Sequence, residues 1–143
     1  MSKGNTYEND LLLLIFNATA IPNIADNAAS SPLTSLYVSL HTADPGEAGT
    51  QTTSECAYGS YARVAVARSG SGWTVSGNTA TNAALIQFPQ CSSGSETVTY
   101  FAVGTAASST GKVLYKGALS SSLAVSSGIQ PQFASGDLDI SED

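Results

Sequence analysis

The chain has 143 residues, of which 42% are hydrophobic and only 11% are charged, and its net charge is −6. The length suits one main globular domain, and so low a charge content excludes a coiled coil or a highly charged disordered chain. Five basic residues cannot form the cationic surface that neutralises phosphates, so no nucleic-acid partner is expected.

A helix is predicted from about Thr6 to Asn17, because Asn5 and Glu8 have the spacing of a capping box. Apolar side chains occupy nearly every side of this helix, so it needs cover on more than one side. Its apolar run Leu11–Phe16 is far shorter than the roughly 20 residues that span a bilayer, and Glu8 and Asp10 stand before it where a signal peptide would have a basic region. We therefore expect no membrane partner and synthesis in the cytoplasm.

The pattern of the chain changes near residue 35. Ile21-Pro22 and Ser31-Pro32 bracket a polar segment with weak periodicity, which predicts an irregular arm. We expect residues 1–34 to form an N-terminal helix and arm that contact other proteins, and residues 35–143 to form a β domain.

Alternation of apolar and polar residues predicts strands throughout the second part. The first strand starts at Ser35 and ends before the turn residues Asp44-Pro45-Gly46. The glycine-rich segment Ser69–Gly72 predicts a hairpin between strands at 61–68 and 73–76. Further strands are expected over residues 83–88, 97–105, 112–119, 123–125 and in the segment 129–140. The expected fold class is mainly β: an antiparallel two-sheet, jelly-roll-like sandwich of about eight strands with a short N-terminal helix.

The residues that bear metal or redox chemistry are dispersed. Cys56 and Cys91 lie outside any CxxC pair, so two buried thiols are favoured over a disulfide. Asp137 and Asp139 lack the loop spacing and glycine of an EF-hand. No metal and no cofactor is expected.

The single histidine, His41, is the one candidate for acid–base chemistry. Asp44 and a nearby serine would complete a hydrolase-like set with it. A histidine beside an Asp-Pro-Gly turn more often only bonds that turn, so we expect no enzyme.

Aromatic residues and two arginines are candidates for binding. The aromatic side chains predict either a sugar-binding platform or, more often, core and rim positions; they are Trp73, Tyr58, Tyr61, Tyr100 and Tyr115. Arg63 and Arg68 flank one strand and point to opposite faces, so one of them is expected to meet a carboxylate or a partner. The competing interpretation is a solvated strand residue or an internal ion pair.

The apolar helix is the strongest candidate for an interface, since contiguous apolar surface marks interaction sites. The competing hypothesis is that the helix packs on the chain's own sheet as core. The expected partner-interface residues are Tyr7, Leu11, Leu12, Leu14, Ile15, Phe16, Ile21 and Ile24, together with Arg63 and Arg68.

Several strings resemble a known group of virion proteins: residues 36–46, 61–68, 73–78, 128–133 and 136–140. They are similar to small proteins of tailed phages often labelled tail fibre, and most of all to the family of jelly-roll capsid cement proteins that includes that of a Bordetella podophage. The resemblance implies a homodimeric decoration subunit, made in the host cytoplasm, on the outer surface of the phage head. It implies the major capsid protein as the partner that the subunit clamps.

Two alternatives remain. The first is a tail-fibre or baseplate module that binds a receptor through loops at one end of the sandwich. The second is a small hydrolase, which a single histidine and scattered acids make the weakest.

Overall fold

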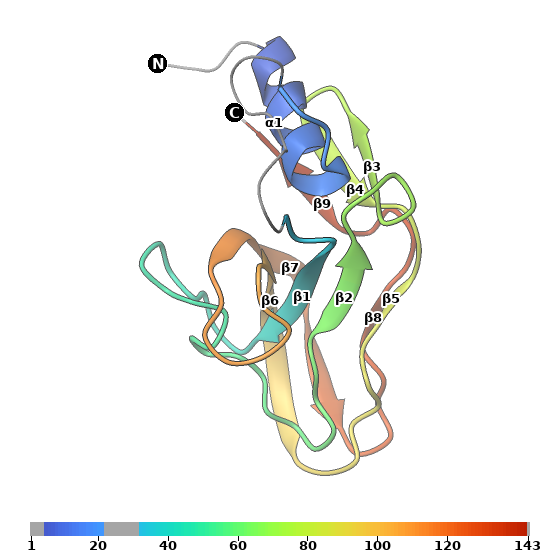
Figure 1. Ribbon diagram of the computed structural model, residues 1–143. Helices are drawn as coiled ribbons and strands as arrows, with labels where there is room; N and C mark the ends of the chain where they lie inside the picture. The colour runs from blue at the N-terminus through green and yellow to red at the C-terminus, as the bar shows by residue number, and fades with distance from the viewer. Residues whose placement is uncertain (1–4, 22–31, 143) are drawn as a thin grey trace. The chain divides into compact units, whose positions relative to one another are not determined.

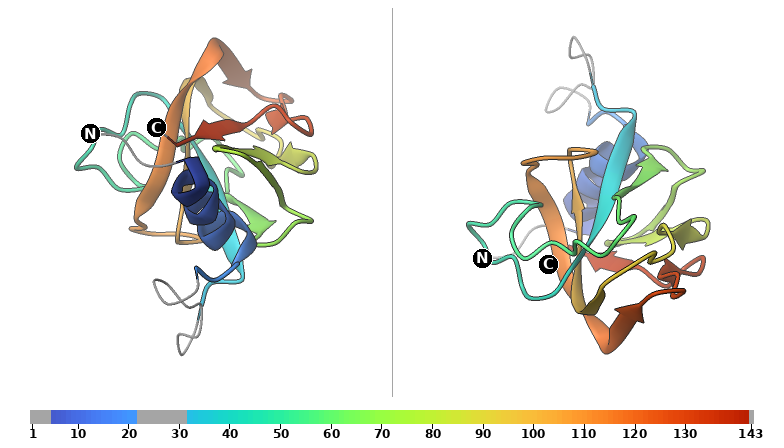
Figure 2. Two further views of the ribbon diagram at one scale, coloured as in Figure 1. Left: turned by 90° about the horizontal axis from the view of Figure 1, so that it is seen from above. Right: turned by 90° about the horizontal axis from the view of Figure 1, so that it is seen from below.

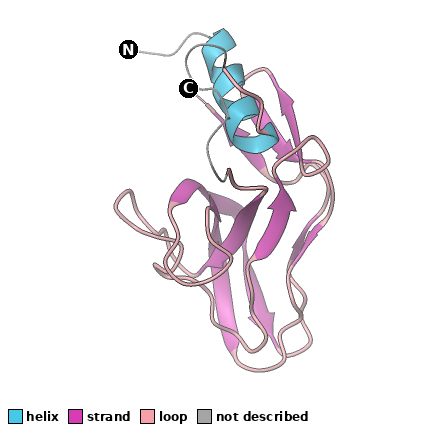
Figure 3. Cartoon of the chain, in the orientation of Figure 1, coloured by secondary structure: helices cyan, strands magenta, loops and turns pink. Residues whose placement is uncertain are grey.

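A computed structural model describes residues 5–21 and 32–142. One helix and nine strands lie in these ranges, and strands dominate the drawing in Figure 3. In chain order, as labelled in Figure 1, they are α1 (Asn5–Asn17), β1 (Ser35–His41), β2 (Val64–Ala67), β3 (Trp73–Ser76), β4 (Thr79–Asn82), β5 (Ile86–Gln87), β6 (Ser95–Gly104), β7 (Val113–Ser126), β8 (Gln132–Phe133) and β9 (Asp139–Ser141).

The strands form three sheets in the described part of the chain. Their orders are β2-β1-β6-β7, β3-β4-β9 and β5-β8. The ladders β1–β6, β6–β7, β3–β4 and β4–β9 are antiparallel. The predicted class, mainly β and antiparallel with an N-terminal helix, is confirmed. The nine strands are distributed over sheets of four, three and two.

The chain divides into two compact units that no single cut in the sequence separates. One unit contains residues 1–35, 66–86 and 133–143, and the other contains residues 36–65 and 87–132. The helical segment therefore shares its unit with two later segments. The division into domains at residues 34 and 35 stays a prediction.

In the first unit, α1 packs against β3 and β4. Leu12 and Phe16 are fully buried and Glu8 is nearly so, which forms one stripe at a spacing of four residues. The ring of Phe16 lies 4.6 Å from that of Trp73. The helix begins one residue before the predicted start and ends where Ala18 takes a φ of 54°.

The hairpin in this unit joins β3 and β4, so the predicted hairpin between residues 61–68 and 73–76 is wrong. Ser76 pairs with Thr79 across a two-residue turn, and Gly77, the first turn residue, has a φ of 61°. A positive φ at that position alone is typical of a type II′ turn, which glycine favours. The prediction missed β4 because Ala80 is the only apolar residue of that strand.

In the second unit, β6 is paired with strands on both sides. Tyr37 to His41 of β1 pair with Gly104 to Tyr100 of β6 in continuous register. Leu36, Val38 and Leu40 are buried, as the alternation predicted. On its other side β6 runs beside β7, the orange strand in Figure 2. This single strand of 14 residues replaces the two strands predicted at 112–119 and 123–125, and it begins one residue after the predicted start.

The described part of the chain contains no helix that is long and apolar enough to cross a membrane.

Candidate functional site

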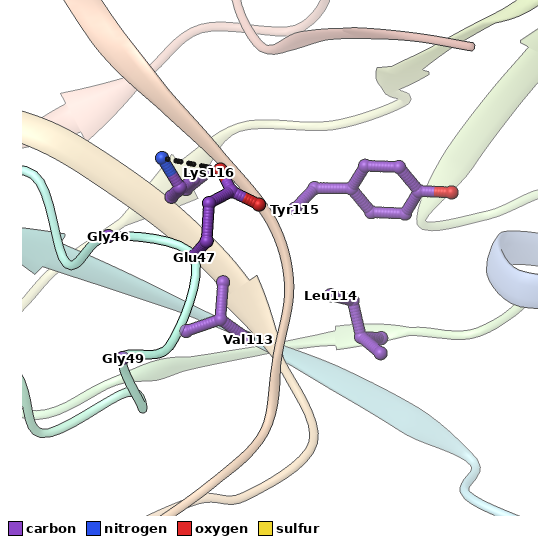
Figure 4. Close-up of a pocket in the computed structure, with 7 residues that line it drawn as sticks. All are labelled: Gly46, Glu47, Gly49, Val113, Leu114, Tyr115 and Lys116. Carbon is purple, nitrogen blue, oxygen red and sulfur yellow. Dashed lines mark ion pairs between the residues drawn. The ribbon is translucent and has the colours of Figure 1, made fainter.

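A shallow surface pocket lies in the second unit, between the loop after β1 and the start of β7 (Figure 4). Its volume is about 240 Å³, and its lining residues are Gly46, Glu47, Gly49, Val113, Leu114, Tyr115 and Lys116. The loop turns sharply because Asp44 Oδ1 accepts a bond of 2.8 Å from the amide of Gly46, whose φ is 76°. The expected Asp-Pro-Gly turn is thereby confirmed.

Lys116 is the cation of this pocket, and two carboxylates hold it. Its Nζ lies 2.9 Å from Asp44 Oδ1 and 3.4 Å from Glu47 Oε1. The hydrogen bond with Lys116 lowers the pKa of Asp44, and the same bond raises the pKa of Lys116. Because Glu47 is almost fully exposed, solvent screens this cluster. The charged side chains at this pocket are thus paired with one another.

His41 and Ser39 form a buried pair on β1. The Ser39 hydroxyl lies 2.9 Å from His41 Nε2, and His41 Nδ1 lies 2.9 Å from the carbonyl oxygen of Thr53. A carbonyl only accepts, so Nδ1 carries the proton and Nε2 of the neutral ring accepts from Ser39. Burial lowers the pKa of His41 below its ordinary value of 6.5, which favours that neutral form.

The His41 pair lacks what a hydrolase site needs. Both Ser39 and His41 are fully buried, so no substrate reaches the hydroxyl. Asp44, the acid considered as a partner, bonds Lys116 instead, and Thr53 takes its place at the ring. The histidine thus holds the loop after β1, as a structural role predicts, although its partner is Thr53 and not the Asp-Pro-Gly turn.

Arg63 forms a two-pronged ion pair with Glu55 in the second unit. Its Nε donates to Oε1 at 2.7 Å and its Nη2 donates to Oε2 at 2.8 Å. Nη1 donates to the carbonyl oxygen of Ala106 and Nη2 also donates to that of Ser109, while the hydroxyl of Tyr61 donates to Glu55 Oε1. The Arg63 side chain is only 3% exposed, and its bonds to Glu55 raise its pKa. Of the roles considered for Arg63, the structure shows the internal ion pair.

Arg68 caps the end of α1 in the first unit. Its Nε donates to the carbonyl oxygen of Ile15 at 2.6 Å, Nη2 donates to that of Leu14, and Nη1 donates to that of Leu33 at 3.0 Å. The last turn of α1 contains no basic residue of its own. Arg68 therefore supplies both hydrogen bonds and positive charge to carbonyls that the helix leaves unpaired. Desolvation lowers its pKa.

The two cysteines are free and buried, which agrees with the interpretation as buried thiols. Burial and the nearby Glu96 raise the pKa of Cys56 to about 12, so its thiol stays protonated and unreactive at neutral pH. Glu96 itself accepts hydrogen bonds from the amides of Ala57 and Tyr58. Among the described residues, no three His, Cys, Asp or Glu side chains gather into a group that would hold a metal ion.

The aromatic residues considered for sugar binding are divided between core and partial exposure. Trp73 is fully buried and Tyr58 nearly so, which places both in the core. Tyr61, Tyr100 and Tyr115 are half-buried. Trp73 Nε1 is buried with no hydrogen-bond partner in residues 5–21 and 32–142. Because Trp73 and Tyr58 are buried, their side chains do not belong to a sugar-binding platform on the surface.

The residues predicted for the interface lie on different sides of α1. Leu12 and Phe16 are fully buried within the chain and Ile21 is nearly so, which leaves them no free surface. Tyr7 is 44% exposed, and Leu11, Leu14 and Ile15 are half-buried. Ile24 lies outside the described residues. The helix thus contributes Leu12 and Phe16 to the core, and the interface role of its exposed and half-buried residues stays a prediction.

Two buried amides that hold loops were missed by the sequence analysis. Asn82 Nδ2 donates to the carbonyl oxygens of Ala84 and Ala134, and Asn82 Oδ1 accepts from the amide of Leu138. Gln51 Nε2 donates to the carbonyl of Tyr37, and Gln51 Oε1 accepts from the amide of Ala106. A lone Asn or Gln in a chain rich in Ser and Thr carries no local signal of burial.

Fold and contacts together define the class: a small antiparallel β protein whose buried polar side chains hold its loops. A family model described as podophage GP4 fiber I protein gp80 matches residues 4–141. Because the match covers nearly the whole chain, the chain belongs to this family of phage fibre proteins. It is a component of the phage virion, and the expectation of a structural rather than enzymatic protein agrees with the family. The comparison with curated proteins found no match.

The family overturns the prediction of a capsid cement protein on the outer surface of the head. It is a fibre family, which agrees with the tail-fibre alternative instead. The error has a physical origin, because the strings that carried the resemblance are mostly strand and turn residues, which specify the fold and not what its surface binds. The major capsid protein was expected as a partner only through that resemblance. Self-association stays a prediction.

Proposed function

We propose that the chain is a structural subunit of the tail-fibre apparatus of a podophage and that it acts by binding other proteins. The observation that carries the proposal is the match of the fibre-protein family over residues 4–141. The contacts of the described residues support it, because the side chains of His41, Arg63 and Arg68 all form hydrogen bonds within the chain that hold the fold. The receptor-binding part of the tail-fibre alternative stays a prediction.

Location in the particle tests this proposal. Virions labelled with gold-conjugated antibodies against the chain should carry gold at the tail, and the copy number should be at most a few dozen per particle. The same antibodies on particles that lack the gene for this chain are the control. Label spread over the head, with hundreds of copies per virion, would contradict a fibre role.

The outward side of α1 is the proposed attachment surface to a neighbouring virion protein. Tyr7 is 44% exposed, and Leu11, Leu14 and Ile15 keep part of their surface in solvent although Leu12 and Phe16 are buried. Exposed apolar surface on a helix is stabilised when a partner covers it. The substitutions Tyr7→Asn and Leu11→Asn should therefore lower incorporation into virions while the purified chain still folds.

A matched control exists for this attachment test. Leu85 is 52% exposed and does not lie on α1, so Leu85→Asn removes similar apolar surface elsewhere. Quantitative immunoblots of purified particles should show a loss for the helix variants and none for the control. Equal incorporation of all variants would exclude this side of α1 as the attachment surface.

A further inference from the structure

The strand β7 ends the four-stranded sheet, so one of its edges has no strand neighbour in the described part of the chain. Six of the seven residues from Ala118 to Ala124 are exposed, and Leu119 is half-buried. Peptide groups along such an edge are ready to pair with another strand. Natural edges are usually protected by charge, proline or irregularity. This segment contains neither a charged residue nor a proline, and the irregularity that it has lies in its ladder with β6.

The ladder between β6 and β7 is interrupted within this same segment. Val98 pairs with Leu123 and Tyr100 pairs with Ala118. Between these pairs β6 has one residue, Thr99, whereas β7 has four, Leu119–Ser122. Thr99 alone cannot pair with four residues, so part of the Leu119–Ser122 backbone has no ladder partner on β6.

The segment reads the same in both directions. Ala118-Leu119-Ser120-Ser121-Ser122-Leu123-Ala124 is a palindrome with Ser121 at its centre. Two such strands in antiparallel orientation, related by a two-fold axis at Ser121, place alanine opposite alanine, leucine opposite leucine and serine opposite serine. Like apolar pairs and pairs of hydroxyl residues stabilise antiparallel strands. This symmetry favours a second copy of the chain as the pairing strand, because a copy matches each residue with one of its own type.

Charge also favours a second copy at this edge. Two chains of net charge −6 repel one another, and a two-fold contact places each patch against its own duplicate. The segment from Gly117 to Gln130 contains no charged residue, so pairing there brings no like charges together. The nearest charge of β7, Lys116, is held by Asp44 and Glu47.

We propose that two copies of the chain pair antiparallel through the outer edges of β7, with Ser121 opposite Ser121 and Ser120 opposite Ser122. The contact joins the two four-stranded sheets into one sheet of eight strands. It goes beyond the proposed function, and it stands whether the subunit belongs to the tail or elsewhere in the virion.

Molecular mass in solution is the first test. Light scattering at about 100 µM, which detects weak association, should give twice the chain mass of 14.5 kDa. Ser121→Lys places two ammonium groups against each other on the axis and should weaken the dimer about tenfold or more. Thr74→Lys is the matched control, because Thr74 is an exposed hydroxyl residue on β3, the end strand of another sheet. A monomeric wild type, or a dimer that Ser121→Lys leaves intact, would overturn the proposal.

Cysteine cross-linking tests the register and does not depend on a change of stability. Opposed residues in an antiparallel pair have Cα atoms about 4.5 to 5.5 Å apart, within the range of about 4.4 to 6.8 Å that a disulfide requires. Ser121→Cys should therefore cross-link to itself on mild oxidation. Ser120→Cys should cross-link only when mixed with Ser122→Cys. Cys56 and Cys91 are buried and should not contribute. Equal cross-linking of Ser120→Cys with itself, or none for Ser121→Cys, would contradict this register.

Discussion

Arg68 Nε lies 2.6 Å from the carbonyl oxygen of Ile15, so a residue 53 positions later in the chain caps the end of α1. Two more bonds from the same guanidinium reach Leu14 and Leu33. The helix owes its position to this contact as well as to Leu12 and Phe16, which are buried on its inner side. One arginine thus fixes where the helix presents its exposed residues.

We expect Arg68→Gln to lower the free energy of unfolding by about 2 to 4 kcal/mol, because it removes charged donors from partly buried carbonyls. Arg68→Lys keeps the charge but not the planar fork, so it should recover only part of the loss. Urea unfolding followed by circular dichroism measures both. A loss below about 0.5 kcal/mol for Arg68→Gln would show that the cap is not needed.

The ion pair of Arg63 and Glu55 should show strong coupling. Either Arg63→Met or Glu55→Gln alone leaves a buried group without its partner and should cost about 3 to 5 kcal/mol. The double variant should cost less than the sum of the single variants by about 1 kcal/mol or more. A double-mutant cycle from chemical unfolding measures this difference. Strict additivity would mean that the pair, although 2.7 Å apart, contributes no mutual stabilisation.

His41 should make the stability of the chain depend on pH. Burial lowers its pKa in the folded state, so the unfolded chain binds a proton that the folded chain does not. This contribution to stability is complete above the unfolded pKa of 6.5 and is lost as the pH falls below that value. At pH 5 the loss from this one group is limited to about 2 kcal/mol.

The variant His41→Gln isolates the pH effect of the histidine. It has no titrating group at this position, so its stability should change less than that of the wild type between pH 8 and pH 5. Thermal unfolding at a series of pH values makes the comparison. Parallel curves for the two proteins would show that His41 keeps an ordinary pKa in the fold.

Substitution of Asn82 should lower the free energy of unfolding more than substitution of a nearby exposed asparagine. Asn82→Ala leaves the amide of Leu138 and two carbonyls without their partners, which should cost about 2 to 4 kcal/mol. Asn78 is the matched control in the same unit, since it is exposed and its side-chain amide donates to the backbone carbonyl of Glu142. Asn78→Ala should cost less than about 1 kcal/mol. Similar losses for both variants would contradict the role of Asn82.

Local patterns in the sequence determined several elements of this fold, although not β4. The period of two from Ser35 onward predicted β1 and its buried apolar residues, but not the burial of Ser39 and His41. The apolar segment after Asn5 predicted α1 almost to the residue. These features depend on side chains that are close together in the chain, so they are visible without the tertiary structure.

Only the tertiary structure decided which elements and side chains meet. Glycine-containing turns lie on both sides of β3, but β3 forms its hairpin with β4 across the second turn and does not pair with β2. No local signal in the sequence distinguished the two turns. The partners of Arg63, Arg68 and Asn82 also depend on contacts between distant segments. The strings that suggested a cement protein are strand and turn residues, which specify how the backbone folds. Binding at the surface depends on exposed side chains that the fold brings together from separate segments of the chain. Their arrangement in space cannot be read from the order of the residues.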